Sequence, residues 1–324
     1  MRLSYYTHTA GLSTSTGYGY AGYNIVSSLE KLGHRVIFDD PAASVQLMFT
    51  QPQDFVKRES QHAIGYTPWE STELNPGWEE YIRLNTDEFW TTSPLNRRWF
   101  EDLDIFVSTV FPHGITHNWT SLKRKPKKKI RFLSVGEPAP RKCGQMVFDA
   151  FIELFGNDER YQLTLKSDGP ITVRYDPSIS GFLARPDHFS NVRIIESNIS
   201  EEEMVSLYHS HDVLLYPSWG EGFGFIALQG LATGMPTIFN PTWAPYAHYS
   251  RGLEITDSLA DSPWPHIHPG KMLEPSKESL KARMLDVVEN FDVYSETYFG
   301  QAAQIHEEFD WVNQTRTAFE PIVK

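Results

Sequence analysis

The chain has 324 residues, of which 40% are hydrophobic and 14% aromatic, and its net charge is −12. One hydrophobic core usually stops growing at about 250 to 300 residues, so this length favours two domains with a cleft between them. The excess of acidic side chains, 41 against 29 basic ones, argues against general binding to nucleic acid or to an acidic membrane surface.

Short apolar runs alternate with helical patterns in the first half of the chain, as expected for beta-alpha units around a parallel sheet. The first strand is predicted at residues 2–6, and a helix runs from about 19 to 32, where Gly33 ends it. Further strands are predicted at 35–40, 45–50, 62–66, 88–93 and 104–109. We therefore assign residues 1–121 to an N-terminal Rossmann-like domain.

The stretch "TSTGYGYAG" carries a G-x-G-x-x-G pattern at three glycines ahead of the first helix, Gly17, Gly19 and Gly22. A dinucleotide fingerprint has its first glycine at the strand end and an acidic residue about twenty residues later. Asp39 and Asp40 meet the second condition, but ten residues, 7–16, separate the strand from Gly17. An NAD-dependent oxidoreductase is therefore the least favoured function.

A basic run from Lys123 to Arg131 places seven positive charges in nine residues. It is either a patch for nucleic acid or lipid headgroups or a solvated linker stiffened by Pro126, and we favour a linker over 122–129.

Residues 130–307 resume the alternation and are assigned to a C-terminal Rossmann-like domain. Helices are predicted at about 144–155 and at 201–210, the second opened by a capping box of Ser200 and Glu203. A last helix, about 308–324, lies far from any remaining strand and is expected to cross back onto the first domain.

Glu221 falls where a buried strand ends and a helix begins, the place at which open α/β sheets present polar groups to ligands. Gly222 and Gly224 lack side chains, so the N–H groups of the first helical turn can approach an anion such as phosphate. Glu221 would then accept hydrogen bonds from a neighbouring hydroxylated group, such as a sugar. Alternatively, Glu221 only complements the positive end of the helix. A Glu221 side chain locked in a buried contact within its own domain would argue against the sugar role.

The stretch "PSWGEGFGFIALQGLATGMPTI" resembles the donor-binding motif of family 4 of the retaining glycosyltransferases, P-S-x-x-E-G-F-G-x-x-x-L-E-A-x-A-x-G-x-P-V-I. The matching positions are Pro217, Ser218, Glu221, Gly222, Phe223, Gly224, Leu228, Ala232, Gly234 and Pro236. The resemblance implies the GT-B architecture, two Rossmann-like parallel-sheet domains that face a cleft, with the acceptor on the first domain and the nucleotide sugar on the second.

Gln229 stands where the E-x7-E motif of that family has its second glutamate. The resemblance implies that Glu221 contacts the donor sugar and that Gln229 accepts from the nucleotide ribose, without a charge-assisted bond. Because the two residues are about two helical turns apart, we expect their side chains near one helix face.

A second segment, "FLSVGEPAPRKCGQMVFDAF", is similar to the family's G-R-x-x-P-x-K-G loop, whose Arg and Lys hold the donor pyrophosphate. Lys142 matches the lysine, Glu137 occupies the arginine position, and Arg141 is the expected substitute. The alternative is two surface cations beside a helix start. The resemblance also implies that Gly17 and Gly19 approach the donor phosphates.

In the first half, "PWESTELNPGW" and "FPHGIT" resemble the family's W-E-x-x-x-x-P and P-H-G-V-D segments. They point to Trp69, Glu70 and His113 as acceptor or cleft residues, although Glu70 is equally consistent with a structural role.

The predicted function is retaining transfer of a sugar from a nucleoside-diphosphate sugar, UDP or GDP above all, to an acceptor hydroxyl. The acceptor is a glycan, a lipid-linked molecule or a modified nucleic-acid base approached through the basic run. Gln229 and Glu137 motivate the alternative of a GT-B epimerase or a non-catalytic sugar-nucleotide binder.

No cofactor or metal is expected. Asp102-x-Asp104 precedes a predicted strand instead of ending one, and the GT-B enzymes that the chain resembles need no such motif. His266-x-His268 has no companion ligands at zinc spacing. The single cysteine, Cys143, excludes an intramolecular disulfide, and no apolar run reaches the ~20 residues of a membrane helix. We therefore expect a cytoplasmic protein.

Overall fold

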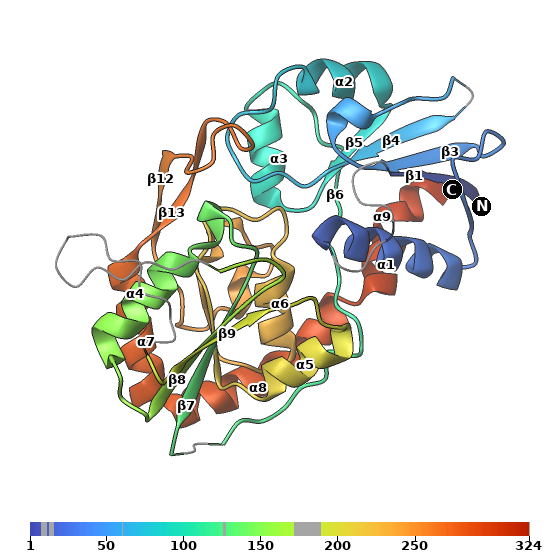
Figure 1. Cartoon of the computed structure of the whole chain (residues 1–324). Coiled ribbons are helices and arrows are strands. Elements are labelled where there is room, and N and C mark those ends of the chain that lie inside the picture. The colour runs from blue at the N-terminus through green and yellow to red at the C-terminus, as the bar shows by residue number, and fades with distance from the viewer. Residues whose placement is uncertain (8–11, 13–15, 60, 126–127, 172–188, 324) are drawn as a thin grey trace.

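The computed structural model contains two parallel sheets, each covered by helices, and they follow one another along the chain (Figure 1). It describes residues 1–7, 12, 16–59, 61–125, 128–171 and 189–323. Within these ranges, no helix has both the length and the apolar character needed to cross a membrane.

The first sheet has the strand order β2-β1-β3-β4-β5-β6, and all its pairs are parallel. Its strands are β1 Arg2–Tyr6, β2 Arg35–Phe38, β3 Val45–Phe49, β4 His62–Tyr66, β5 Glu88–Thr91 and β6 Thr109–Val110. The helices of this part are α1 Gly17–Lys31, α2 Trp78–Asn85 and α3 Pro94–Glu101, with a 3-10 turn η1 at Pro52–Asp54.

The prediction of a strand at 104–109 is wrong except at Thr109, where β6 begins. Asp104 has a left-handed backbone, with φ 57°. The N–H groups of Leu103 and Ile105 both bond to the carbonyl of Phe100. These residues therefore finish α3, and the chain becomes extended only afterwards.

The second sheet has the order β11-β10-β7-β8-β9, again all parallel. Its strands are β7 Ile130–Val135, β8 Tyr161–Ser167, β9 Val192–Glu196, β10 Val213–Tyr216 and β11 Thr237–Phe239. The helices α4 Gly144–Phe155, α5 Glu201–His209, α6 Phe225–Ala232 and α7 Lys277–Glu289 surround it, with 3-10 turns η2 Pro140–Lys142, η4 Pro241–Trp243 and η5 Ala247–Tyr249. A two-stranded antiparallel hairpin, β12 Asp257–Asp261 and β13 Lys271–Pro275, stands apart from the sheet.

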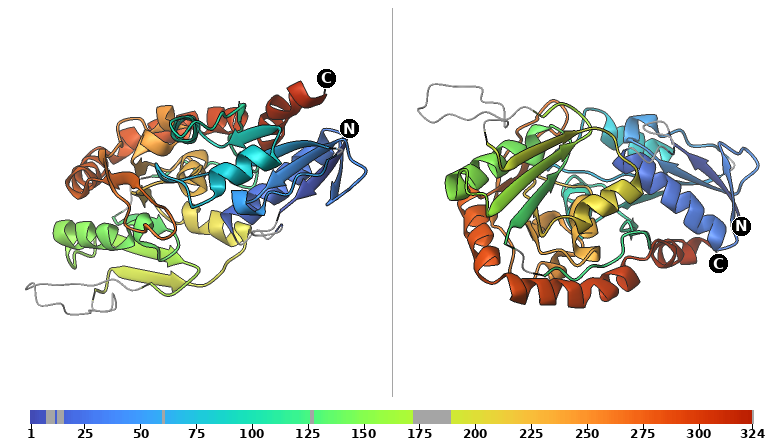
Figure 2. Two further views of the ribbon diagram at one scale, coloured as in Figure 1. Left: turned by 90° about the horizontal axis from the view of Figure 1, so that it is seen from above. Right: turned by 60° about the horizontal axis from the view of Figure 1, so that its bottom comes forward.

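The last two helices join the two halves of the molecule (Figure 2). Helix α8, Phe291–Glu308, runs along the second sheet's helices, and α9, Trp311–Val323, packs on α1. Trp311, Ala318 and Phe319 of α9 belong to the core of the first half. The end of the chain thus returns to the part that contains its beginning.

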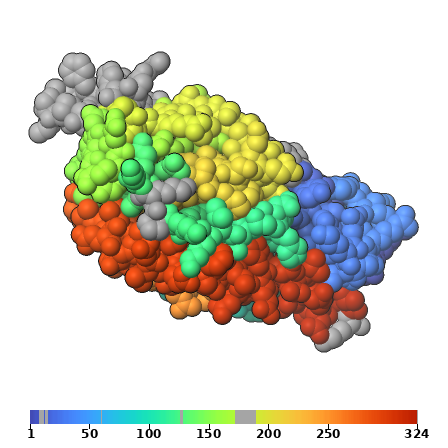
Figure 3. Space-filling model, turned by 90° about the horizontal axis from the view of Figure 1, so that it is seen from below, coloured from blue at the N-terminus to red at the C-terminus, as the bar shows by residue number. Residues whose placement is uncertain are grey.

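The basic run is not a uniformly solvated segment. Arg124 is 5% exposed, and its guanidinium donates to the backbone carbonyls of Tyr208, His211 and Thr233. Figure 3 shows the surrounding segment lying between α5 and α8. Burial lowers the pKa of Arg124 to about 10. The expectation of a solvated linker is therefore wrong at Arg124, because the guanidinium binds backbone carbonyls at the C-terminal ends of α5 and α6.

Candidate functional site

A compact ionic cluster lies at the carboxyl ends of two neighbouring strands, β7 and β10. Glu221 is in the turn between β10 and α6, and Arg141 and Lys142 are in η2, which follows β7. Ends of this kind bring loops from adjacent strands together in parallel sheets. The structure thus brings together three of the residues predicted from separate sequence segments.

The cluster is held by short hydrogen bonds. The Lys142 Nζ donates to Oε1 and Oε2 of Glu221 at 2.7 and 2.8 Å and to the Tyr216 hydroxyl at 2.8 Å. The Tyr216 and Ser218 hydroxyls donate to Glu221 Oε1 at 2.8 and 2.6 Å. Arg141 Nη1 lies 3.2 Å from the same oxygen, whereas its Nη2 donates to Glu137 Oε1 at 3.0 Å. Among the described residues, every hydrogen-bond partner of the Glu221 carboxylate therefore comes from its own half of the molecule.

The charges of the cluster shift the pKa values of its members. Burial would raise the pKa of Glu221, but Lys142 and Arg141 outweigh burial and lower it to about 2. Burial and the neighbouring Arg141 lower the pKa of Lys142, although Glu221 opposes them. Burial opposes ionisation of Arg141, yet its acidic neighbours raise its pKa overall. At neutral pH Glu221 is thus a carboxylate neutralised by two adjacent cations.

This arrangement corrects two expectations about Glu221. The side chain is 6% exposed and is engaged by partners of its own domain, the observation set out above as unfavourable to a sugar-reading role. To contact a sugar, the carboxylate must leave at least some of these partners. Glu221 also precedes α6, which begins at Phe225, so Glu221 and Gln229 do not share a helix face. Gln229 instead lies against Tyr208, whose hydroxyl is 3.5 Å from Gln229 Oε1.

The glycines of the β10–α6 turn permit close packing. A Cβ on Gly222 would lie 2.3 Å from Pro68 Cβ of the first domain, and one on Gly220 would lie 2.6 Å from the Glu70 carbonyl oxygen. Gly224, with φ +85°, would place a Cβ 2.3 Å from Trp243. Approach of the N–H groups of this turn to an anion stays a prediction. At Gly220 and Gly222 the turn contacts the first domain.

Phe223, also predicted to bind the donor, is a buried core residue. It is 3% exposed, and its ring packs against His113, Phe225 and Tyr246. It stabilises the turn from inside the domain interface.

Gly17 and Gly19 begin α1, two residues earlier than predicted. Thr16 caps the helix by accepting the Gly19 N–H at 3.1 Å, and no atom of the described residues lies within 4 Å of a Cβ built on Gly17. Most of the loop before them, 8–11 and 13–15, lies outside the described residues. Contact of these two glycines with donor phosphates stays a prediction.

Trp69 and His113 are buried rather than lining a cleft. Trp69 is 3% exposed, stacks near Trp78 and donates its indole N–H to the Glu73 carbonyl at 2.9 Å. His113 is 3% exposed, and its ring stacks on Phe225 and Trp311. Neither ring nitrogen of His113 has a hydrogen-bond partner in the part of the chain that the structure describes, and burial lowers its pKa to about 3.

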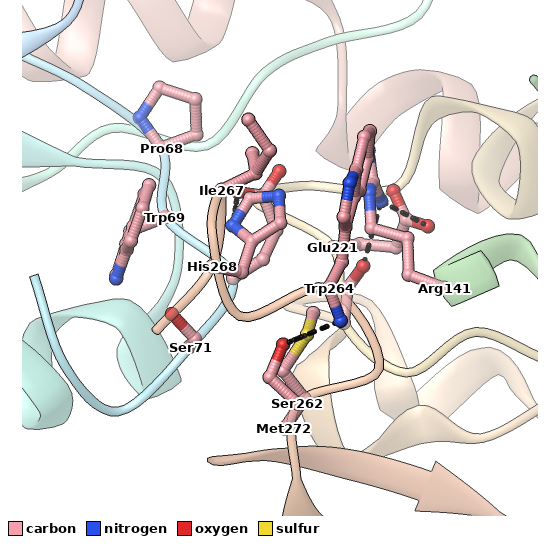
Figure 4. Close-up of polar contacts among 12 residues, drawn as sticks. Pro68, Trp69, Ser71, Arg141, Glu221, Ser262, Trp264, Ile267, His268 and Met272 are labelled. Carbon is pink, nitrogen blue, oxygen red and sulfur yellow. Dashed lines mark hydrogen bonds and ion pairs between the residues drawn. The ribbon is translucent and has the colours of Figure 1, made fainter. Parts of the chain in front are cut away.

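Glu70 is the one predicted cleft residue of the first domain that faces the cluster, and it has a partner that sequence reasoning missed. Its Oε2 lies 3.6 Å from Nδ1 of His268, in the loop between β12 and β13 (Figure 4). His268 drew attention only as half of a rejected metal motif. No pattern in the sequence connects the hairpin loop to Glu70.

A cavity of about 240 Å³ adjoins the cluster at the start of α4. Gly136, Glu137, Lys142, Gly144 and Lys166 line it, so it lies at the carboxyl ends of β7 and β8. A larger hollow of about 500 Å³ runs along α2 in the first domain and shares no residue with the cluster. We regard the smaller cavity as the better ligand site, because charged groups and a helix N-terminus converge on it. Among the described residues, no group of three or more His, Cys, Asp and Glu side chains is placed to hold a metal ion.

Comparison with known proteins identifies the fold. The sucrose-phosphate synthase of Thermosynechococcus elongatus superposes with a TM-score of 0.71 at 13% identity, covering 99% of this chain and 98% of that one. Anabaena HepE, solved in complex with UDP-glucose, gives 0.66 at 10% identity and covers 100% and 99%. At these identities the likeness shows the fold, which is the GT-B arrangement of two Rossmann-like domains, as predicted.

The sequence comparison is shorter. A D-inositol 3-phosphate glycosyltransferase of Corynebacterium efficiens is 30% identical over 114 residues, which are 32% of this chain and 25% of that protein. The match thus spans about a quarter of that relative's length. No protein-family model matches the sequence.

Proposed function

We propose that the chain is a glycosyltransferase that moves a sugar from a nucleoside-diphosphate sugar to an acceptor hydroxyl. The observation that carries the proposal is the Arg141–Lys142–Glu221 cluster beside a cavity at the start of α4, in a GT-B fold. Two buried cations next to a helix N-terminus are suited to a diphosphate. HepE, which shares the fold, was solved with UDP-glucose, so UDP-glucose is the first donor to test.

The chemistry follows from the charge that develops during transfer. As the bond between sugar and phosphate breaks, negative charge grows on the leaving diphosphate. Arg141 and Lys142 would stabilise that charge because they are already fixed in place by η2. Glu221 would turn from these cations to hydroxyls of the donor sugar. Membership of family 4, retention of configuration, independence of metal and a cytoplasmic location remain parts of this proposal.

The cluster makes a specific prediction about Glu221. A diphosphate and the Glu221 carboxylate compete for the same two cations, so donor binding must displace the carboxylate. Glu221→Gln should therefore bind UDP more tightly than the wild type while transferring the sugar more slowly. Equal or weaker UDP binding would contradict the competition. A donor complex in which Glu221 keeps all its present partners would contradict its assigned contact with the sugar.

Ligand-induced stabilisation is the direct test of the function. Thermal shift is measured with UDP, GDP, ADP and TDP and their glucose or mannose forms, since a ligand that binds only the folded chain raises its melting temperature. Release of the nucleoside diphosphate is then followed for each donor that binds. Lys142→Ala should lose the shift. Lys277→Ala, which removes an exposed lysine paired with Glu153, is the matched control and should keep it. No shift with any nucleotide in the wild type would contradict the proposal.

A further inference from the structure

The loop between β12 and β13, residues 262–270, crosses from the second domain to the first. The strand that follows it is tied to Thr72, which donates its N–H to the Lys271 carbonyl at 3.0 Å and accepts the Lys271 N–H on Oγ1 at 2.9 Å. The Asn75 side chain also donates to the Ile267 carbonyl at 3.2 Å. The loop therefore lies directly over the 69–75 segment that contains Glu70.

Gly270 shows how close this contact is. Its φ is +76°, and a Cβ there would lie 2.7 Å from Glu73 Cγ and 2.8 Å from Thr72 Oγ1. Only a glycine fits both the left-handed backbone and the space. The loop is thus shaped to close against the first domain.

His268 is the polar side chain that this loop carries inward. It is 6% exposed, and its ring centroid lies 5.0 Å from Trp69 and 6.0 Å from Trp264. Its Nδ1 is buried and has no hydrogen-bond partner among the described residues. A buried polar atom left unpaired is costly, so it requires an explanation.

Glu70 Oε2 lies 3.6 Å from that nitrogen, a separation too long for a hydrogen bond. Glu70 is 17% exposed and contributes to raising the pKa of Arg141, which places it next to the ionic cluster. In the view of Figure 4, Trp264 stands between His268 and Arg141. A His–carboxylate pair contributed by two domains therefore adjoins the groups assigned to the donor.

We propose that His268 and Glu70 form the hydroxyl-binding pair for the acceptor, and that loop 262–270 is the lid that delivers His268. In this arrangement Nδ1–H donates to Glu70, and the Nε2 lone pair accepts a hydrogen bond from the acceptor hydroxyl. Because both side chains are largely covered while the loop is tied to Thr72, the acceptor enters when the loop lifts, and the 3.6 Å gap between the pair closes to a hydrogen bond when the loop returns over the bound acceptor. This inference rests on the proposed function and names the residues that meet its second substrate.

The main alternative is that His268 only fills the space between two indole rings. Two substitutions separate the possibilities. His268→Phe keeps a flat ring between Trp69 and Trp264 but has no acceptor atom. His268→Gln loses the ring but keeps an amide oxygen that can accept from a hydroxyl. If His268 is only a spacer, the Phe variant should keep more activity than the Gln variant. If His268 binds a hydroxyl, the Gln variant should keep more activity than the Phe variant.

The experiment measures two quantities for each variant, using UDP-glucose or the donor that the nucleotide panel identifies. UDP affinity is measured by calorimetry. UDP release from the donor is measured in water alone and with rising concentrations of glycerol, so that water and glycerol are the two hydroxyl acceptors tested. We expect His268→Phe to keep UDP affinity within about twofold but to slow release at least about tenfold, since one hydrogen bond to the reacting molecule is lost. His268→Gln should be less impaired, and Glu70→Gln should lie between the two because it only orients the ring.

Each of the other possible outcomes of this experiment has a single interpretation. Wild-type rates in His268→Phe, or a smaller loss in Phe than in Gln, would overturn the inference and leave the proposed function standing. A parallel loss of UDP affinity in His268→Phe would also overturn it, because the histidine would then be structural. A wild-type chain that neither binds nor cleaves any sugar nucleotide would remove the proposed function and this inference together.

Discussion

The two sides of the candidate site are built in opposite ways. On the second domain, Glu221 and Lys142 are buried, paired and held by contacts of 2.7 and 2.8 Å within a single domain. Across the boundary, Glu70 and His268 come from different domains, stand 3.6 Å apart and leave a buried nitrogen unpaired. The first side can form when its own domain folds. The second side exists only while the domains are in contact, so substitutions should be able to damage one without the other.

On the first side, the Glu221–Lys142 contacts of the second domain, the largest effect is expected for Lys142→Ala. It leaves Glu221 buried with one cation fewer, and breaking a buried ion pair typically costs about 3 to 5 kcal/mol of unfolding free energy. UDP affinity should also fall about 10- to 100-fold, as expected for loss of a charge-assisted contact. Urea unfolding and calorimetry measure the two effects.

The control for that prediction replaces both partners. Lys142→Met with Glu221→Met removes the charges together, so most of the lost stability should return while UDP binding stays lost. If the double variant unfolds as easily as Lys142→Ala, the stability loss does not come from an unpaired Glu221 charge.

Gly222→Ala should break the second side and spare the first. The new Cβ would lie 2.3 Å from Pro68 Cβ, so the turn and the first domain must separate locally. We expect UDP affinity to stay within about threefold but donor cleavage to fall at least about tenfold, because misplacement of reacting groups by ~1 Å costs about 100-fold. Gly300→Ala in α8, outside the site, is the control, since no atom of the described residues lies within 4 Å of its added Cβ. An equal loss of UDP affinity and cleavage in Gly222→Ala would mean that the two sides are not independent.

Periodicity and local motifs were sufficient to predict the fold. The helix predicted at 144–155 is α4, and the capping box of Ser200 and Glu203 is present at the start of α5. Both are signals between residues close in sequence, which reflect backbone geometry and hydrogen bonding within one element. The GT-B architecture follows from the alternation of such elements together with the resemblance of the β10–α6 segment.

The site was predicted only in part, because its remaining features depend on contacts between distant residues. The motif identifies Glu221. The hydrogen bonds that Lys142 and Tyr216 make in this cluster, however, form only because β7 and β10 lie side by side. Gly222 looks like a phosphate-loop glycine. The residue that leaves no room for a Cβ there, Pro68, belongs to the other domain. His268 has no sequence signal at all, since its environment is created by closure of a loop over another domain.

His113→Phe should remove the pH dependence that His113 gives to the contact between the domains. His113 follows β6 and stacks on Phe225 of α6, with Tyr66 as the titratable neighbour in ring contact. Burial lowers its pKa to about 3, below the ~6.5 of an unfolded chain, so it destabilises the fold as pH falls from about 6.5 towards 3. Between pH 7.5 and 5.0 the wild type should lose about 2 kcal/mol of unfolding free energy through this residue. Urea unfolding at the two pH values should show that much less loss in His113→Phe, and an identical loss would contradict the assignment.

The smallest effect is expected for Tyr20→Phe, which removes one hydrogen bond between the domains. The Tyr20 hydroxyl on α1 donates to Glu201 Oε1 on α5 at 2.9 Å, and Thr116, Asn118 and Trp119 also donate to that carboxylate. Since Glu201 keeps three donors, the loss should be about 1 kcal/mol of unfolding free energy. Tyr23→Phe on the same helix is the control, because Tyr23 is 51% exposed and its change should be near zero. UDP affinity should be unchanged in both variants. A drop in UDP affinity for Tyr20→Phe alone would mean that the donor side depends on the domain contact, and the distinction between the two sides of the site would then be wrong.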